Sequence, residues 1–211
     1  MDYVRATYAN NMLTTGVNRF SKLAVLNYDK SFEDVNASYW ADDMIKKMAA
    51  KQILFGISET EFAPKKNVTR AEFVTIITRA LEIESSKPNV FKDVDPTKWY
   101  ASYIAAAFEA GIVSGRTTDV FAPEETLSRE EMAIMILKAY KFHTGQNAVA
   151  DEMNNFRDAD TISDWAKDAV SAAAKLGFIK GRGKELFMPH EKMNRAESAH
   201  IISLFLEEIS K

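Results

Sequence analysis

The chain has 211 residues, of which 46% are hydrophobic, so it can bury a core, and its net charge of only -3 gives no bulk attraction to nucleic acid or to a membrane surface. It has no cysteine, which excludes disulfide frameworks, thiolate catalysis and cysteine-ligated zinc. No apolar run approaches the roughly 20 residues of a membrane span, and the start of the chain lacks the features of a signal peptide, so we expect an internal or C-terminal piece if the parent protein is exported.

Residues 1–31 differ in kind from the rest of the chain. Two segments rich in β-branched and aromatic residues, 3–7 and 20–26, flank a polar stretch that contains Gly16. This pattern favours a short hairpin. We expect these residues to be the tail of a preceding domain and a linker.

The remainder contains one unit repeated three times. Eight residues recur 59 residues later without a gap, and again 125 residues from the first copy after one inserted residue. They are Phe32, Asp34, Trp40, Gly56, Phe62, Pro64, Arg70 and Glu72, then Phe91, Asp93, Trp99, Gly115, Phe121, Pro123, Arg129 and Glu131, then Phe156, Asp158, Trp165, Gly181, Phe187, Pro189, Arg195 and Glu197. A fixed period of this length indicates a repeat architecture.

The first half of each copy predicts a helix with an apolar stripe. The stripe consists of Trp40, Met44, Ile45 and Met48, of Trp99, Tyr103, Ile104 and Ala107, and of Trp165, Ala169, Val170 and Ala173. A single tryptophan at the start of such a stripe is more often a core anchor than a platform for a sugar ring. We therefore favour the core role for the three tryptophans and keep sugar stacking as the alternative.

Glycines mark the end of the first helix and the loop after it. Gly111 and Gly177 suit a left-handed C-cap, and Gln52 takes this place in the first copy. The loops carry a second glycine at Gly56, Gly115 and Gly181. We expect it to permit a positive φ, with close approach of a ligand as the alternative.

The second half of each copy predicts a helix that begins with a capping box. Thr69 with Glu72, Ser128 with Glu131, and Asn194 with Glu197 each place a capping side chain three residues before a carboxylate. The helices that follow have wide apolar faces, which require burial on more than one side. We predict a mainly α fold in which three second helices form a central bundle, with the first helices and loops outside it.

An arginine occupies the first position of each second helix: Arg70, Arg129 and Arg195. The helix dipole disfavours a cation there by up to about 1 kcal/mol. One explanation is a receptor for a ligand carboxylate, built from the guanidinium and free N–H groups of the helix N-terminus. The other is an internal salt bridge to Asp34, Asp93 or Asp158. For these aspartates themselves we favour bonds to backbone amides of the entry turn and keep contacts to sugar hydroxyls as the secondary alternative.

The motifs resemble a known family. Phe-x-Asp-Val, the Trp of the first helix, Gly-Ile-Val-Ser-Gly, Phe-x-Pro and Thr-Arg-Ala-Glu are similar to the S-layer homology (SLH) repeat, present as residues 32–84, 91–144 and 156–209. The segment 17–25 is similar to the end of a module that precedes such repeats. The resemblance implies a pseudo-threefold, three-pronged spindle whose inter-repeat grooves bind pyruvylated secondary cell wall polysaccharide, and a secreted protein held at the cell wall or S-layer.

The resemblance favours a ligand-binding role for at least two of the three helix arginines. The candidate ligand-binding residues are Arg70, Arg129, Arg195, Arg116, Arg182, Trp40, Trp99, Trp165, Asp34, Asp93, Asp158, Gly56, Gly115 and Gly181. The first copy departs from the pattern, because Ile57 lies where the others have Arg116 and Arg182. We therefore expect unequal grooves.

An enzyme is the first rival interpretation. The three histidines occur in unlike contexts without metal-ligand spacing, and no nucleophile elbow, phosphate loop or zinc motif is present. We expect no catalytic residue, metal or cofactor, no nucleic-acid partner and no membrane insertion. The alternative function is a helical-repeat scaffold for protein partners. We expect a monomer, covalently continuous with an ectodomain outside this sequence.

Overall fold

The computed structural model describes residues 6–10, 12–16, 29–150, 156–183 and 185–211. Near its start, β1 (Thr7–Ala9) and β2 (Met12–Thr14) form an antiparallel hairpin with Tyr8 opposite Leu13. The paired strands lie closer together in sequence than predicted. The second predicted strand, 20–26, and most of the first, 3–7, fall outside the described residues.

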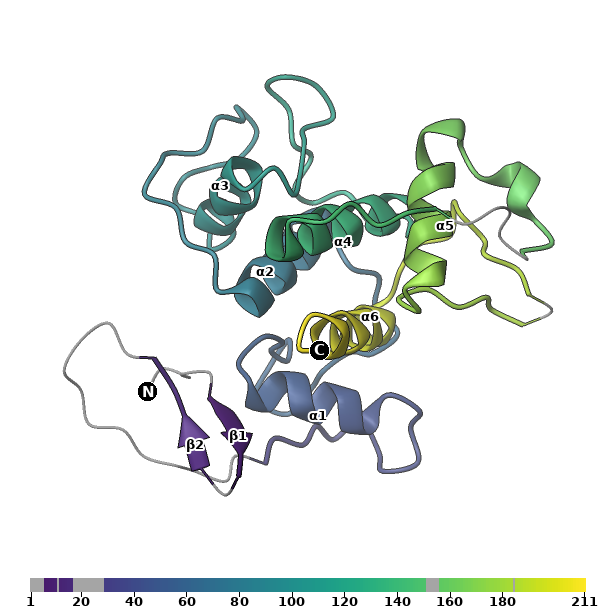
Figure 1. The fold of residues 1–211 in the computed structure, drawn as a ribbon. Coiled ribbons are helices and arrows are strands. Elements are labelled where there is room, and N and C mark those ends of the chain that lie inside the picture. The colour runs from purple at the N-terminus through teal and green to yellow at the C-terminus, as the bar shows by residue number, and fades with distance from the viewer. Residues whose placement is uncertain (1–5, 11, 17–28, 151–155, 184) are drawn as a thin grey trace.

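The described part of the chain is mainly helical, as predicted (Figure 1). The first helices of the three repeats are α1 (Asp42–Ala50), α3 (Ala101–Glu109) and α5 (Lys167–Lys175). The second helices are α2 (Arg70–Leu81), α4 (Arg129–Thr144) and α6 (Arg195–Glu208). Two short 3-10 helices, η1 (Ala159–Thr161) and η2 (Asp164–Ala166), precede α5.

The helices pack between repeats in cyclic order. The second helix of each repeat lies against the first helix of the next one, as α2 with α3, α4 with α5, and α6 with α1. Within the core, α2 also contacts α4 and α6. Because α6 returns to α1, the last repeat closes on the first; the pseudo-threefold spindle and the repeat bounds stay predictions.

Three backbone hydrogen bonds join the repeats ahead of their second helices. The N–H of Val68 donates to the carbonyl of Met193 at 2.8 Å, that of Met193 to Leu127 at 3.0 Å, and that of Leu127 to Val68 at 3.0 Å. All three side chains are buried. Buried polar backbone groups require partners, and here each repeat supplies the partner of another.

The local predictions for the second helices are confirmed. All three capping boxes form, and the side chains of Thr69, Ser128 and Asn194 accept the N–H of the glutamate three residues later. Each glutamate in turn accepts the N–H of its capping residue, at 2.8 to 2.9 Å. A capping residue stabilises a helix by about 1 kcal/mol, and its geometry depends only on neighbours in sequence.

The prediction that the tryptophans anchor the core is wrong. Trp40, Trp99 and Trp165 are 53%, 55% and 58% exposed, although the residues that follow them in each stripe are buried or half-buried. Trp40 and Trp99 lie before the first residues of α1 and α3, and Trp165 lies in η2. Because these positions precede the regular helix, the helical period does not turn the indole toward the core.

The explanation of the loop glycines by positive φ is also wrong. Gly111 and Gly177 do have φ values of +71° and +78°, and Gln52 shares this conformation at +54°, but Gly56, Gly115 and Gly181 do not. A Cβ at Gly115 would lie 2.3 Å from the carbonyl oxygen of Thr117, and one at Gly56 would lie 2.3 Å from that of Ser58. These two glycines are required because their loops fold back on themselves.

Candidate functional site

Each helix arginine binds the loop of the next repeat. Arg70 donates from Nε to the carbonyl of Phe121 at 3.1 Å and from Nη2 to that of Ser114 at 3.2 Å. Its guanidinium carbon also lies 4.8 Å from the centroid of the Phe121 ring. The arginine of the first repeat is thereby fixed to both ends of the second repeat's loop.

The same bonds recur at the other two junctions between repeats. Arg129 donates from Nε to Phe187 at 2.7 Å and from Nη2 to Lys180 at 3.2 Å. Arg195 donates from Nε to Phe62 at 2.8 Å and from Nη2 to Phe55. All three arginines are buried, so a cation at the first helical position is explained by its bonds between repeats.

The prediction that the helix N-termini offer free N–H groups is wrong. The first two N–H groups of α2, those of Arg70 and Ala71, donate to the carbonyls of Glu125 and Pro123, and the third is taken by the capping side chain of Thr69. The other two second helices are capped by the next repeat in the same way. These helix N–H groups are therefore not available to a ligand anion.

The aspartates bond backbone amides, as one alternative predicted, but in the Phe-x-Pro segment. Asp93 accepts the N–H of Phe121 at 2.8 Å and that of Ala122 at 2.6 Å, and Ala122 has a φ of +61°. Asp34 and Asp158 repeat this clamp in their own repeats. The aspartates thus hold the carbonyls that the helix arginines bind, and among the described ion pairs the arginines meet glutamates instead.

In two repeats, a single carboxylate oxygen lies between two guanidinium groups. Oε1 of Glu131 is 3.6 Å from Nη1 of Arg70 and accepts a short hydrogen bond from Arg116. Oε1 of Glu197 lies 3.7 Å from Nη1 of Arg129 and is bound by Arg182, with an Nε distance of 2.8 Å. Each capping glutamate therefore uses one oxygen for the helix cap and the other for the two cations.

Burial is the main cause of the pKa shifts at these sites. It lowers the pKa of Arg70, of Arg195, and of Arg129, whose value falls to about 10. The like charge of Arg116 lowers the pKa of Arg70 further, and Arg182 does the same to Arg129. Two cations held this close repel each other, so an added anion would be stabilised beside them.

A cleft opens beside each of these arginine pairs. The Arg129 cleft, of about 220 Å³, is lined by residues that include Arg129, Gly181, Arg182, Glu197 and Trp40. The Arg70 cleft, of about 260 Å³, has the matching residues Arg70, Gly115, Arg116, Glu131 and Trp165. Each cleft thus takes its buried arginine, its loop and its tryptophan from three different repeats.

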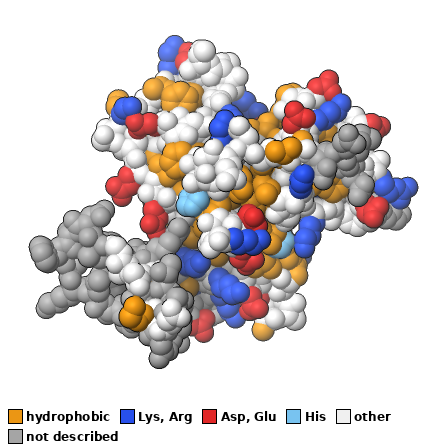
Figure 2. Space-filling model, in the orientation of Figure 1, with side chains coloured by type: hydrophobic (Ala, Val, Ile, Leu, Met, Phe, Trp, Pro, Cys, Tyr) orange, Lys and Arg blue, Asp and Glu red, His pale blue; other side chains and the backbone are white. Residues whose placement is uncertain are grey.

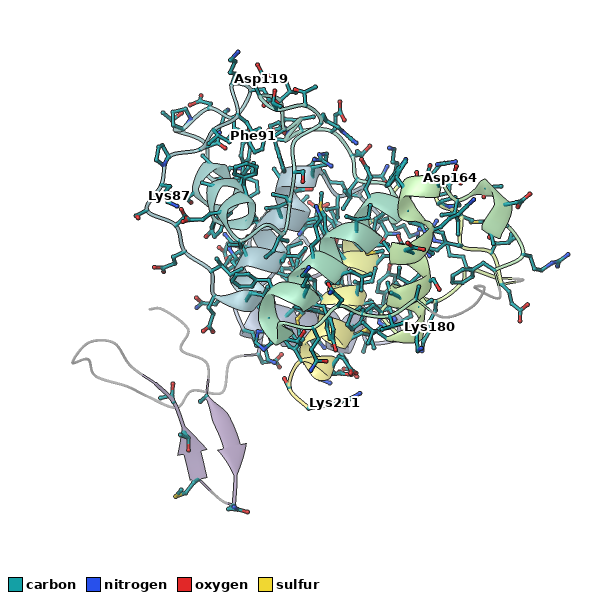
Figure 3. All side chains as sticks on the ribbon, turned by 45° about the horizontal axis from the view of Figure 1, so that its top comes forward. Lys87, Phe91, Asp119, Asp164, Lys180 and Lys211 are labelled. Carbon is teal, nitrogen blue, oxygen red and sulfur yellow. The ribbon has the colours of Figure 1, made fainter. Side chains whose placement is uncertain are left out.

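The loop arginines are the accessible cations of these clefts. The side chains of Arg116 and Arg182 are 39% and 31% exposed, whereas those of Arg70 and Arg129 are 5% exposed. Glu125 also holds Arg116, at 3.0 Å, so two carboxylates share that cation. Figure 3 labels Lys180, which adds a further cation to the Arg129 cleft.

The third junction has the same backbone bonds but lacks the second cation. Glu72 lies 3.9 Å from Nη1 of Arg195, and Ile57 takes the place of Arg116 and Arg182. Ile57 is 47% exposed. By the cyclic order of the repeats, Trp99 belongs to this junction. The loops differ in composition, as the sequence indicated. The structure adds which helix arginine binds which loop, and the sequence did not reveal these pairs.

Figure 2 shows Lys, Arg, Asp and Glu side chains interspersed on the face it presents. No group of three or more His, Asp or Glu residues that could hold a metal ion occurs among the described residues. Within the same residues, no helix is long and apolar enough to cross a membrane.

Sequence reasoning missed several residues that line the clefts. Glu131 and Glu197 were recognised only as capping residues, because their second contact comes from a loop 15 residues away. His200 lines the Arg129 cleft, where its ring lies 5.7 Å from that of Trp40. Its position three residues after Glu197, on the same face of α6, gave the only signal.

A trio of cyclically joined helical repeats with paired arginine clefts defines the class of this protein. Residues 31–74, 90–133 and 155–199 match the S-layer homology domain. These matches cover more than half of the chain, so the chain belongs to the S-layer homology family. The resemblance inferred from the sequence motifs is confirmed.

Known relatives include both enzymes and surface-layer proteins. The chain is 37% identical over 95% of its length to an amylopullulanase of Thermoanaerobacterium thermosulfurigenes and 38% identical over 94% to the exoglucanase XynX of Acetivibrio thermocellus. It is 32% identical over 82% to the S-layer protein sap of Bacillus anthracis. The chain spans only 11%, 18% and 21% of these relatives.

The family defines the role and the place of this chain. S-layer homology domains are non-catalytic modules that anchor surface proteins to the cell wall by binding cell wall polymers. The protein is therefore secreted and associated with the cell wall. The relatives named as enzymes are much longer than the matched region, so their names do not assign catalysis to it.

Proposed function

We propose that the chain anchors a longer secreted protein by binding pyruvylated secondary cell wall polysaccharide in the Arg70 and Arg129 clefts. The observation that carries this proposal is the pair of guanidiniums on one glutamate oxygen in each cleft. In the Arg129 cleft, two guanidiniums and one carboxylate leave an excess of positive charge. In the Arg70 cleft, Glu125 offsets that excess, and Lys138, which also lines the cleft, restores it. A pyruvyl ketal carries one carboxylate, which matches that excess.

The side chains have distinct roles in this proposal. The exposed Arg116 and Arg182 contact the ligand carboxylate. The buried Arg70 and Arg129 hold the loops by hydrogen bonds and add positive electrostatic potential to the clefts. Trp165 and Trp40, which are more than half exposed, offer their faces to a sugar ring. An indole supplies a large apolar face at low entropic cost. Arg195 and Trp99 form a junction with less capacity for an anion.

The same proposal covers the chain's wider context. The anchor acts as a monomer and is covalently continuous with an ectodomain, which supplies whatever activity the whole protein has. The module itself needs no cofactor and performs no catalysis. The short share of each relative that it matches supports this division of labour.

A sedimentation assay with protein-free cell walls tests the proposal. The chain is expected to pellet with walls that carry pyruvylated polysaccharide and to remain in the supernatant with walls whose ketal has been removed. Because the walls contain no protein, binding also distinguishes an anchor from a scaffold for protein partners. Equal binding to intact and polymer-stripped peptidoglycan would contradict the proposal.

A further inference from the structure

The turn that leads into each first helix has a hydroxyl residue two positions before the tryptophan: Ser38, Thr97 and Ser163. In the first two repeats this turn is held locally. The N–H and the hydroxyl of Ser38 both donate to Oδ1 of Asn36, at 3.0 and 2.6 Å. Those of Thr97 donate to Oδ1 of Asp95 at 2.8 and 2.7 Å. An Asn or Asp side chain two residues earlier is a usual acceptor in such a turn.

The third repeat holds the same turn from a neighbouring repeat. Thr161 stands at the position of the local acceptor, and its hydroxyl donates instead to the carbonyl of Asp158 at 2.7 Å. The N–H of Ser163 donates to Oε2 of Glu130 at 3.1 Å, and its hydroxyl donates to Oε1 at 3.2 Å. Glu130 belongs to the second repeat. Its carboxylate therefore makes the two bonds that a local side chain makes in the other repeats.

The residue type of Glu130 is specific to this junction. The other second helices have Ala71 and Ala196 at its position, and all three residues donate their N–H to a proline carbonyl of the next repeat. The helix start therefore does not need the carboxylate. Glu130 is 4% exposed, and burying a carboxylate costs free energy unless it is hydrogen-bonded. Its partners both come from the third repeat, because Nδ1 of His190 also lies 3.1 Å from Oε1.

The chain ahead of the third first helix differs from that of the other repeats. One residue is inserted between Asp158 and Trp165, and this segment forms η1 and η2. Ser163 is the N-cap of η2, and its carbonyl accepts the N–H of Ala166 at 2.8 Å. A single turn of 3-10 helix has poor hydrogen-bond geometry of its own. The bonds from Ser163 to Glu130 therefore help to set where η2 lies.

The tryptophan of the Arg70 cleft lies in η2. Trp165 is its middle residue and lines this cleft together with Ile134 and Lys138 of α4. η2 packs on α4, and Ala166 is fully buried. The indole is 58% exposed, so packing alone holds it only in part. Glu130, at the start of α4, thus ties the backbone beside the indole to the helix that supplies its neighbours in the cleft.

We propose that Glu130 is the positioning residue of Trp165 in the Arg70 cleft. It acts through Ser163 and does not itself line the cleft. Only the role of Trp165 toward a sugar rests on the proposed function, because the bonds among Glu130, Ser163 and η2 need no ligand. The Arg70 cleft takes its arginines from the first and second repeats. It receives its tryptophan in the correct place only while the junction between the second and third repeats is intact.

NMR of the indole N–H groups in the full chain tests the positioning without a ligand. The chain has three tryptophans, so each indole signal reports one of them. Glu130→Ala should shift the signal of Trp165 and leave that of Trp99 unchanged. Alanine is compatible with this helix position, as Ala71 and Ala196 show. Asp95→Ala is the matched control, because it removes the turn acceptor ahead of Trp99 and should shift that signal instead.

A second substitution supplies the missing local acceptor. Thr161→Asp places a carboxylate two residues before Ser163, as Asp95 is placed before Thr97. In the Glu130→Ala background it should return the Trp165 signal toward its wild-type position, which a general loss of stability would not explain. An unchanged Trp165 signal in Glu130→Ala, an equal shift at Trp99, or no return in the double variant would overturn the proposal.

Titration with a pyruvylated disaccharide tests the consequence for binding. Glu130→Ala should weaken binding reported at Trp165 by about three- to tenfold, because a displaced indole stacks less well, and should leave binding reported at Trp40 unchanged. Thr161→Asp should restore the loss. If the wild type does not respond to the disaccharide, the proposed function fails while the ligand-free result still decides the role of Glu130. Equal affinity at Trp165 in wild type and Glu130→Ala would overturn that role in binding.

Discussion

The Arg129 cleft and the Arg195 junction share one backbone and differ in charge. In both, a buried arginine donates to two loop carbonyls of the next repeat, and a capping glutamate lies within 4 Å of its Nη1. The loop residue that follows the glycine is Arg182 in one and Ile57 in the other. The comparison teaches that the bonds that build the fold are repeated strictly, whereas the exposed residue after the loop glycine is free to change.

The largest expected effect comes from breaking the shared backbone. Asp93→Asn replaces one carboxylate oxygen with an amide that cannot accept an N–H, while Ala122 still has a positive φ. We expect the free energy of unfolding to fall by about 3 kcal/mol, measured by urea denaturation. Asp34→Asn should cost a similar amount at the Arg195 junction, and Asp158→Asn at the Arg129 cleft, because each aspartate makes the same two bonds.

A surface carboxylate provides the control for this change. Asp119 pairs with Lys92 at 2.7 Å and bonds Thr117, and all these contacts are exposed. Asp119→Asn should therefore cost less than about 1 kcal/mol. A large loss in Asp93→Asn with none in Asp34→Asn would show that the two junctions do not share one clamp.

The next effect concerns the charge that distinguishes the two junctions. Arg182→Ala should lower affinity for a pyruvylated disaccharide by about tenfold or more, because a charge-assisted hydrogen bond contributes about 1.5 to 3 kcal/mol. Ile57→Ala should leave affinity unchanged. Calorimetry on folded variants measures both. If the arginine variant binds normally, or the isoleucine variant does not bind, the proposed anion clefts are wrong.

This experiment uses the loop arginines for a structural reason. The helix arginines are candidate ligand-binding residues by sequence, but each of them fixes a loop through buried hydrogen bonds. Arg129→Ala would leave the carbonyls of Phe187 and Lys180 without these partners and would destabilise the junction. A loss of binding in that variant would not distinguish ligand contact from folding.

A smaller effect sharpens the comparison between the two anion clefts. Glu125 binds Arg116 at 3.0 Å, whereas in the described residues the side chain of Arg182 is bonded to Glu197. Glu125→Gln should therefore raise affinity at the Arg70 cleft by roughly two- to fivefold. Glu191→Gln, at the same position of the third repeat, is the matched control. Calorimetry that finds equal gains in both variants would contradict this role of Glu125.

The smallest effect is the pH dependence of folding stability that comes from His200, which lines the Arg129 cleft. Burial, followed by the charge of Lys180, lowers the pKa of His200 below the ordinary value of 6.5. The unfolded chain then binds the proton more readily than the folded chain, so stability is present above pH 6.5 and is lost as pH falls below it. Unfolding of wild type and His200→Gln between about pH 8 and 5 should show a steeper loss in wild type. Parallel curves would contradict it.

The helices and their caps could be predicted because their causes are local. Thr69 and Glu72 are three residues apart, and the apolar stripe of α1 repeats within one helix. The exposure of Trp40 could not be predicted in this way, since it depends on where the chain enters the helix. The arginine repeated at the first position of each second helix indicated that a cation is needed there. It did not indicate that the cation binds the loop of the next repeat.

The sequence predicted which residue types form the site, but it did not predict which residues contact each other. Arg195 binds a carbonyl 133 residues away, and Arg70 binds one 51 residues away. No local pattern encodes such distances, so free helix N–H groups were the simpler expectation. The positions of Arg116 and Arg182 after the loop glycine did carry a usable signal, because the first copy breaks the pattern there.

The return of α6 to α1 has a consequence for how many repeats this anchor can hold. In an open solenoid, either end can accept another unit, and length is set only by the gene. Here the bonds from Arg195 to the first repeat's loop occupy the one face on which a fourth unit would dock. The number of units is therefore limited by closure, since a fourth unit could join only by breaking the bonds between the third repeat and the first.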